Sequence, residues 1–265
     1  MKKYALLGEK LSHSYSSVIH EEILKDMGID ATYELLELEK NQLKTAIDKL
    51  KSGEYNGYNV TIPYKKEIMK YLDEISDEAL HIGSVNTIVY ENGKTIGYNT
   101  DYYGFYNELL YYNVDLKGKD CYILGTGGAS LAVSKACLDL GANVYFVSRS
   151  HSDKENVITY LELEHRNIDV IVNTTPVGMY PNMGVSPLKK EITKKAKYVL
   201  DIIFNPRQTQ LLKDANSNMD GLFMLVGQAI KAEEIWQKKA YDEPISKLLK
   251  RIEMKIWIIL EDYFK

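Results

Sequence analysis

Cysteine, tryptophan and proline are scarce in this sequence: its 265 residues include two cysteines, two tryptophans and six prolines. Two cysteines are too few for a disulfide framework, and neither they nor the five histidines are spaced as metal ligands. We therefore predict no metal site. Cys121 begins an apolar strand pattern and Cys137 lies in a helical one, so both are expected to pack in the core.

Long hydrophobic runs are also missing. No stretch reaches the ~18 apolar residues that a membrane span requires, and the apolar run near Met1 is too short for a secretory signal. Lysines and arginines number 33 against 37 acidic residues, a formal net charge of −4, so nothing favours nucleic acid or an anionic membrane as a partner. We expect a cytoplasmic protein whose partner is a small molecule.

Strand and helix patterns alternate along the chain, which predicts βαβ units around a mostly parallel sheet. Strand patterns cover residues 4–7, 32–36, 58–62, 84–90, 95–98, 121–124, 143–148, 169–173 and 198–203. Helical patterns cover residues 18–27, 42–50, 64–72, 101–112, 128–140, the region after 227, and 245–259. Asn92-Gly93 predicts a type I′ hairpin turn, and Thr100 is the expected N-cap of the helix that follows it.

A polar cradle is predicted in the segment GYNVTIPYK, residues 57–65. Asn59 and Thr61 are two apart, so on a strand they face the same way. Pro63 is expected to end the strand, and Lys65 then lies in the turn or in the first turn of the next helix. An amide, a hydroxyl and an ammonium suit a small polyhydroxylated molecule on which a proton moves. A strand–turn–helix corner with a solvated lysine is the alternative interpretation.

A glycine turn follows the strand at 121–124 and opens the helix at 128. It comprises Gly125, Gly127, Gly128, Ala129 and Ser130, with the serine in place of the usual third glycine. Glycine there permits a tight turn and close approach of a pyrophosphate to the helix N-terminus. The pattern is typical of a Rossmann-like dinucleotide-binding domain, and a plain strand–helix turn is the alternative.

The next strand ends in Ser148, Arg149 and Ser150, where an NAD-binding chain usually carries an acidic residue. An arginine at this place suits the 2′-phosphate of NADP. The sequence therefore favours NADP over NAD, unless Arg149 is only a solvated surface residue.

Seven segments resemble the shikimate dehydrogenase family, in that family's order and approximate spacing. They are GEKLSHSYSSVIH (8–20), NVTIPYK (59–65), GSVNT (83–87), GYNTDYYG (97–104), GTGGAS (125–130), NTTPVGM (173–179) and GLFMLVGQ (221–228). The resemblance implies a two-domain α/β fold. Residues 1–101 and 226–265 would form the substrate-binding and catalytic domain, and residues 102–225 a shortened Rossmann-like NADP domain.

The resemblance also implies residue roles. Lys65 and Asp101 would be the catalytic pair for reversible hydride transfer between C3 of shikimate and NADP, a step of aromatic amino acid biosynthesis. Shikimate would be surrounded by Ser14, Ser16, Asn59, Thr61, Asn86, Asp101 and Gln228, with His13 in a structural role. The cofactor would contact Thr175, Gly178 and Met179 besides the glycine turn and the residues around Arg149. The chain would act as a monomer or homodimer.

Two departures from the family pattern lead to further expectations. Phe204 stands where the family commonly has a tyrosine, so one substrate contact should be lost. About twenty residues separate Arg149 from the strand at Asp169, too few for the family's usual helix plus strand, which predicts weak NADP affinity. Two alternatives stay open: a quinate/shikimate dehydrogenase that prefers NAD, and a dinucleotide-binding regulator without catalysis. The presence of both Lys65 and Asp101 argues against the regulator.

Overall fold

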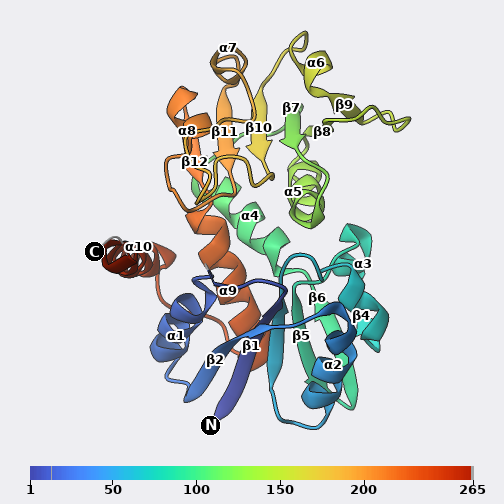
Figure 1. The fold of residues 1–265 in the computed structure, drawn as a ribbon, viewed down its shortest axis with the longest axis vertical. Helices are drawn as coiled ribbons and strands as arrows, with labels where there is room; N and C mark the ends of the chain where they lie inside the picture. The colour runs from blue at the N-terminus through green and yellow to red at the C-terminus, as the bar shows by residue number, and fades with distance from the viewer. Residues whose placement is uncertain (13, 264–265) are drawn as a thin grey trace. The chain divides into compact units, whose positions relative to one another are not determined.

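A computed structural model describes residues 1–12 and 14–263, with side chains to residue 259. His13, whose predicted role is structural, lies outside the described residues. The chain divides into two compact units, residues 1–100 with 226–265 and residues 101–225. The divisions fall inside helices α4 (Thr100–Tyr111) and α9 (Leu222–Gln237), which Figure 1 labels. Within the described part of the chain, no helix is long and apolar enough to span a membrane.

The first unit contains a six-stranded sheet in the order β2-β1-β3-β5-β6-β4. Its strands are β1 (Lys2–Gly8), β2 (Ala31–Glu37), β3 (Gly57–Val60), β4 (Glu74–Ile75), β5 (Thr87–Glu91) and β6 (Lys94–Tyr98). β1 is parallel to β2 and β3, whereas β5 is antiparallel to both β3 and β6, so the sheet is mixed. Asn92 and Gly93 join β5 to β6 with φ of 53° and 79°, which confirms the predicted type I′ turn.

Helices cover both faces of this sheet (Figure 1). They are α1 (Ser16–Met27), α2 (Leu43–Lys51), α3 (Asp77–Ile82) and α9, with 3₁₀ turns η1 (Lys40–Gln42) and η2 (Glu67–Tyr71), while α10 (Ile245–Tyr263) packs against α1. On one face, the buried side of α2 packs with Leu7 and Ile88. On the other face, Trp236 of α9 stacks on Tyr4, and its indole nitrogen donates to the Ile88 carbonyl at 3.0 Å.

The second unit contains an all-parallel sheet in the order β12-β11-β10-β7-β8-β9. Its strands are β7 (Asp120–Leu124), β8 (Asn143–Ser148), β9 (Val157–Thr159), β10 (Val170–Asn173), β11 (Tyr198–Asp201) and β12 (Asn218–Asp220). The central strands are buried on both faces, as their apolar sequences predict. Chain order reverses between β7 and β10, and such a switch point is where open α/β sheets bind ligands.

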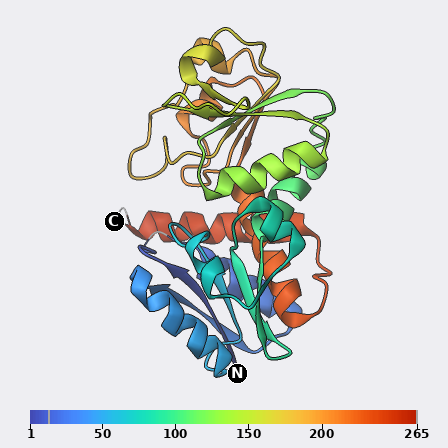
Figure 2. The same ribbon diagram turned by 90° about the vertical axis from the view of Figure 1, so that its right-hand side faces the viewer.

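Helices also sandwich the second sheet (Figure 2). One face is covered by α4 and α5 (Gly128–Asp139), and the other by the short helices α6 (Tyr160–Leu163), α7 (Lys190–Thr193) and α8 (Gln210–Asp214). Cys121 and Cys137 meet in the first of these layers, both fully buried, with their sulfurs 3.6 Å apart and reduced. Their predicted role in the core is confirmed.

Several predicted element ends are wrong. The helix expected at 64–72 is a turn followed by η2, and the strand expected from 84 begins at Thr87. α9 begins at Leu222, so Gln228 lies inside this helix. α4 begins at Thr100, which is therefore the first helical residue and not its N-cap. The Thr100 hydroxyl instead accepts from Asn86 Nδ2 at 3.0 Å, so a donor distant in the sequence bonds to the oxygen that local capping would have used.

The segment between Arg149 and β10 corrects another expectation. It holds both a strand and a helix, β9 of three residues and α6 of four, although about twenty residues were expected to be too few for the family's usual helix plus strand. β8 reaches its parallel neighbour β9 through residues 149–156 without a helix. The sheet thus keeps six strands, and what is shortened is the helical cover beside Arg149.

Candidate active site

The predicted substrate residues of the first unit lie at one edge of its sheet. β1, β3 and β6 end at this edge, and antiparallel β5 begins there. Ser14 and Ser16 follow β1, Thr61 and Lys65 follow β3, and Asn86 precedes β5. Hydroxyl, ammonium and amide groups from separate parts of the sequence are therefore gathered by strand ends.

The loop after β1 is closely folded. The Ser14 and Ser16 hydroxyls lie 3.1 Å apart, and the Ser16 backbone N–H donates to Ser14 Oγ at 3.3 Å. A Cβ on Gly8 would come within 2.8 Å of Thr61 Cγ2 and 2.5 Å of Leu11 Cδ2, so glycine lets the start of this loop lie against Thr61 without displacing either side chain. The two serines and Thr61 thus belong to one region of the first unit.

Lys65 lies in a turn that is tied to the β5 side of the site. Tyr64 N–H donates to the Thr61 carbonyl at 2.9 Å, which closes the turn, and Tyr64 Oη donates to the Leu38 carbonyl at 2.6 Å, which anchors it. The Lys65 carbonyl accepts from Val85 N–H at 2.8 Å. Because Val85 immediately precedes Asn86, this bond brings the two predicted site residues to one corner of the sheet edge.

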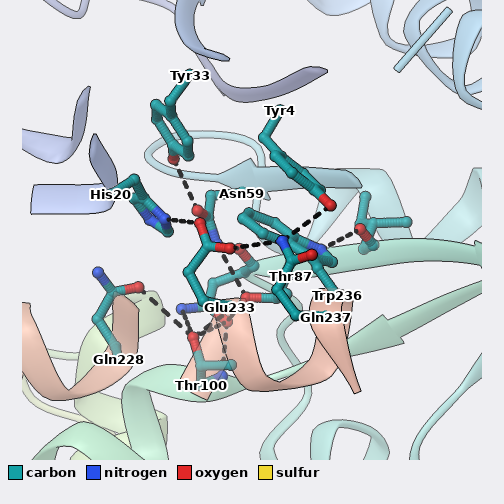
Figure 3. Close-up of polar contacts among 12 residues, drawn as sticks. Tyr4, His20, Tyr33, Asn59, Thr87, Thr100, Gln228, Glu233, Trp236 and Gln237 are labelled. Atoms are coloured by element: carbon teal, nitrogen blue, oxygen red, sulfur yellow. Dashed lines mark hydrogen bonds and ion pairs between the residues drawn. The ribbon is translucent and has the colours of Figure 1, made fainter. Parts of the chain in front are cut away.

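Asn86 and Thr100 form the central contact of the site (Figure 3 labels Thr100 and Gln228). Asn86 Oδ1 accepts from Thr100 N–H at 2.7 Å, and its Nδ2 donates to Thr100 Oγ1 at 3.0 Å. The Thr100 hydroxyl lies 3.5 Å from Gln228 Oε1 on α9. Asp101 comes next, buried in the first turn of α4, where the helix dipole favours a carboxylate.

Asn59 differs from the other predicted substrate residues. It is 4% exposed, and both hydrogens of its amide are used by protein acceptors, the Asn86 carbonyl at 3.2 Å and Thr87 Oγ1 at 3.0 Å. Its Oδ1 accepts from Tyr33 Oη at 2.7 Å. Asn59 is thus fully bonded within the protein, and its contact with the substrate stays a prediction. Neither Tyr33 nor Thr87 was predicted as part of the site, although Thr87 ends the segment GSVNT; no quoted segment contains Tyr33.

The glycine turn of the second unit joins β7 to α5. Gly125 has φ of +101°, and a Cβ there would lie 3.0 Å from Thr175, so both its conformation and its neighbour require glycine. Gly127 is the N-cap of α5, no side chain caps this helix, and a Cβ on Gly127 would meet nothing within 4 Å. The open helix start with its N–H groups, which includes Gly128 and Ala129, fits a pyrophosphate.

Ser130 has a different role from the glycines. It is fully buried, and its hydroxyl donates to the Gly127 carbonyl at 2.7 Å. The side chain of the serine that replaces the third glycine is therefore bonded to the backbone of the glycine turn itself.

The end of β8 presents Arg149 to solvent. Ser150 N–H donates to Ser148 Oγ at 3.2 Å, which forms a small turn under the arginine. Among the described residues no acidic side chain pairs with Arg149. Burial raises the pKa of nearby Tyr160, and the Arg149 charge opposes that rise. An exposed guanidinium without an acidic partner suits the 2′-phosphate of NADP.

The loop after β10 completes the cofactor side. Asn173 Oδ1 accepts from the Thr175 backbone N–H at 3.0 Å and from its hydroxyl at 2.7 Å. Thr174 Oγ1 donates to the Leu124 carbonyl at 2.7 Å, which ties this loop to the glycine turn across the switch point. Gly178, at φ of +96°, bends the loop so that Met179 is exposed.

Asp201, at the end of β11, supports that loop, although the sequence did not suggest this role. The side chain is 2% exposed and accepts from Asn173 Nδ2 at 3.0 Å, Ile203 N–H at 3.1 Å and Thr209 Oγ1 at 2.7 Å. Burial raises its pKa to about 6, and these hydrogen bonds moderate the rise. Phe204, three residues further on, is half-buried in the following segment.

An all-parallel sheet with a glycine turn at its switch point, opening onto an uncapped helix, defines the second unit as a Rossmann-type dinucleotide-binding fold. Comparisons with known proteins agree with this assignment and identify a particular family within the class. Residues 6–88 match the family model described as the shikimate dehydrogenase substrate binding domain.

Full-length relatives give the same result. The chain is 46% identical to "Shikimate dehydrogenase (NADP(+))" of Clostridium beijerinckii, over 100% of both chains. It matches the crystal structure of shikimate dehydrogenase 1 from Peptoclostridium difficile with a TM-score of 0.87 and 42% identity, covering 96% of this chain and 99% of that one. The Thermus thermophilus enzyme, solved in complex with NADP(H) and shikimate, matches with a TM-score of 0.86 and 27% identity, covering 96% and 99%. The chain belongs to the shikimate dehydrogenase family.

Proposed function

We propose that this protein is an NADP-dependent shikimate dehydrogenase, which reversibly reduces 3-dehydroshikimate to shikimate in aromatic amino acid biosynthesis. The observation that carries the proposal is the Asn86–Thr100 contact. In this contact Asn86 is bonded to Thr100, the residue that precedes Asp101. The carbonyl of Lys65 accepts a hydrogen bond from the backbone N–H of Val85, the residue that precedes Asn86. The family relatives with NADP(+) in their names support the same activity.

The proposed chemistry assigns one proton to Lys65. When NADPH is bound, it supplies the hydride that reaches C3 of the substrate. The Lys65 ammonium then donates a proton to the C3 oxygen, so that the carbonyl becomes a hydroxyl, and in the reverse direction the neutral amine takes that proton back. Asp101 keeps its carboxylate near the same oxygen and orients the lysine and the hydroxyl.

The remaining site residues bind and orient. The Ser14 and Ser16 hydroxyls suit the substrate carboxylate, because each can donate to an anionic oxygen. The Thr61 hydroxyl and the Asn86 and Gln228 amides suit the ring hydroxyls. The proposed cofactor residues are the turn from Gly125 to Ser130, the segment Ser148 to Ser150, and Thr175, Gly178 and Met179. Residues 1–101 and 226–265 would be the substrate domain and residues 102–225 the NADP domain.

An absorbance assay of the reduced nicotinamide tests the proposal, with shikimate or quinate as substrate and NADP or NAD as cofactor. Turnover of shikimate with NADP is expected, and Lys65→Ala should abolish nearly all of it. Lys66→Ala is the matched control, since Lys66 is the adjacent, exposed lysine and should be dispensable.

Other outcomes have definite meanings. Turnover mainly of quinate with NAD would identify the sister enzyme. Cofactor binding without turnover of any pair would identify a regulator, and loss of activity in Lys66→Ala equal to that in Lys65→Ala would refute the role of Lys65. We also propose that the protein is located in the cytoplasm. We further propose that it is a monomer or a homodimer, and light scattering after gel filtration distinguishes these two states.

A further inference from the structure

Asn59 is held in one orientation by its neighbours. Its Nδ2 faces the Asn86 carbonyl at 3.2 Å, and a carbonyl only accepts hydrogen bonds. The opposite orientation of the amide would bring two oxygens together. Oδ1 must therefore face Tyr33, and the Tyr33 hydroxyl must donate its single hydrogen to it, at 2.7 Å.

The orientation of Asn59 determines the next hydroxyl. Asn59 Nδ2 donates to Thr87 Oγ1 at 3.0 Å, so the Thr87 hydrogen is directed onward. The acceptors within reach of the Thr87 hydroxyl are Asn86 Oδ1 at 3.2 Å and Thr100 Oγ1 at 3.1 Å. A continuous set of hydrogen bonds thus runs from β2 through β3 to the Asn86–Thr100 contact (Figure 3).

Tyr33 itself is held by packing. Its ring stacks on His20 with centroids 4.0 Å apart and planes at 10°, and it tilts against Trp236 at 6.4 Å. It is 5% exposed. Burial raises the pKa of Tyr33 well above its usual value, and the charge of Glu233 adds to that rise, so the hydroxyl keeps the proton that it donates.

We propose that Tyr33 and Asn59 are positioning residues that orient Asn86 for the substrate, a role that rests on the proposed function. Asn59 holds the backbone of Asn86 directly and its side chain through Thr87, while the Tyr33 hydroxyl holds Asn59 in place by donating to its Oδ1. Neither residue touches the reacting atoms. A small error in the orientation of a residue that contacts the substrate weakens substrate binding. The effect of Tyr33 and Asn59 on Asn86 can therefore be measured as a change in the KM for shikimate.

The test is Tyr33→Phe, which removes one hydroxyl and keeps the ring that stacks on His20. The KM for shikimate should rise about three- to tenfold, the range expected for one neutral hydrogen bond. The KM for NADP should stay within about twofold, because the cofactor residues belong to the other unit. kcat should change less than the KM for shikimate.

Tyr58→Phe is the matched control. Tyr58 lies next to Asn59 on β3, is fully buried, and its hydroxyl has no hydrogen-bond partner in the described part of the chain. The two variants make the same chemical change in the same sheet. Tyr58→Phe should leave the KM for shikimate unaltered, so an equal rise in both variants would indicate a general structural effect and overturn the proposal.

A double-mutant cycle tests the route through Asn59. On an Asn59→Ala background, Tyr33→Phe should raise the KM for shikimate no further, because the acceptor of the Tyr33 hydroxyl is already gone. Independent effects of the two substitutions would overturn the coupling. The side-chain amide resonance of Asn59 should also shift in Tyr33→Phe and stay in place in Tyr58→Phe, a readout that needs no substrate.

The wild-type protein separates the two proposals. If the wild type turns over shikimate and Tyr33→Phe has the same KM for shikimate as the wild type, only the positioning role is refuted. Lack of shikimate turnover by the wild type would refute both the proposed function and the role that rests on it.

Discussion

The Nδ1 of His20 lies 2.7 Å from the Oε1 of Glu233, and both side chains are completely buried. This contact joins α1, which begins at Ser16, to α9, which carries Gln228. Glu233 Oε2 also accepts from Gln237 Nε2 at 2.9 Å, so both of its oxygens are bonded. A fully buried acid–imidazole contact therefore connects the two helices that carry proposed substrate residues (Figure 3).

Removing one partner of this contact should be costly. Glu233→Ala removes the carboxylate partner of the fully buried His20 and one of the two acceptors of the Gln237 amide, so the free energy of unfolding should fall by about 3–5 kcal/mol, as for other broken buried pairs. Denaturant unfolding measures it. Glu243→Ala, which breaks the exposed contact with Lys247, is the control and should cost under about 1 kcal/mol. Similar losses in the two variants would contradict the prediction.

Asp201 should make stability depend on pH in the direction opposite to that of an ion-paired carboxylate. Its pKa is raised from 3.8 to about 6 in the folded protein, so folding favours the protonated acid. The contribution is complete below about pH 4, is lost as the pH rises through 6, and amounts to about 3 kcal/mol.

Asp201→Asn keeps the shape of the side chain and cannot titrate. The difference in unfolding free energy between wild type and variant, measured by denaturant at each pH, should therefore change between pH 4 and 7 and be constant above it. All other carboxyl groups titrate in both proteins, so their contributions to this difference in unfolding free energy cancel. A flat difference over the whole range would show that Asp201 does not have the raised pKa.

The two glycines of the cofactor turn should respond differently to alanine. Gly125→Ala places a side chain at φ of +101° and 3.0 Å from Thr175, so it should destabilise the protein without cofactor by about 1–2 kcal/mol. Gly127→Ala meets no protein atom within 4 Å, so it should leave that stability unchanged. It should nevertheless weaken NADP binding about five- to hundredfold, because its methyl group enters the proposed pyrophosphate site.

Thermal unfolding without cofactor, and titration with NADP, measure the two effects separately. If Gly127→Ala bound NADP as tightly as the wild type, the pyrophosphate would not lie at the start of α5.

Arg149 should account for much of the preference for NADP. Arg149→Ala removes a charged hydrogen-bonding group from the proposed 2′-phosphate site, so the KM for NADP should rise about 10–100-fold while the KM for NAD stays the same. Lys117→Ala makes the same change of charge at an exposed position of the same unit and serves as the control. Equal effects on NADP and NAD would assign Arg149 to another part of the cofactor.

NADP affinity itself tests the effect of the missing helix between β8 and β9. The segment from 149 to 156 gives the adenosine end little cover, so we expect a weaker dissociation constant than in relatives with a full helix there. Titration of this protein and of a relative whose structure has a full helix at this place, under identical conditions, makes the comparison. Equal constants would show that this segment is not important for affinity.

Part of the fold and of the site was predictable from local patterns. Asn92-Gly93 predicted its turn because both positions require positive φ, and Gly125 was recognisable between an apolar strand and a helix. Element ends were less predictable. Thr100 was expected to cap α4 and is its first residue, since Asn86 offers it a hydrogen bond that no local pattern reveals.

By itself, the sequence determined the order of the longer strands and helices, the glycine turn, and the presence of Lys65, Asp101 and Arg149 near element ends, but not the short strands β4, β9 and β12 or the short helices α3, α6, α7 and α8. These features depend on backbone sterics and on periodicity over a few residues. Only the tertiary structure decided that Asn59 faces Tyr33, that Asp201 is buried beneath the loop after β10, and that Glu233 meets His20 from 213 residues away. Burial and bonding partners come from chain packing over long separations, and they decide whether a polar residue contacts the substrate or supports one that does.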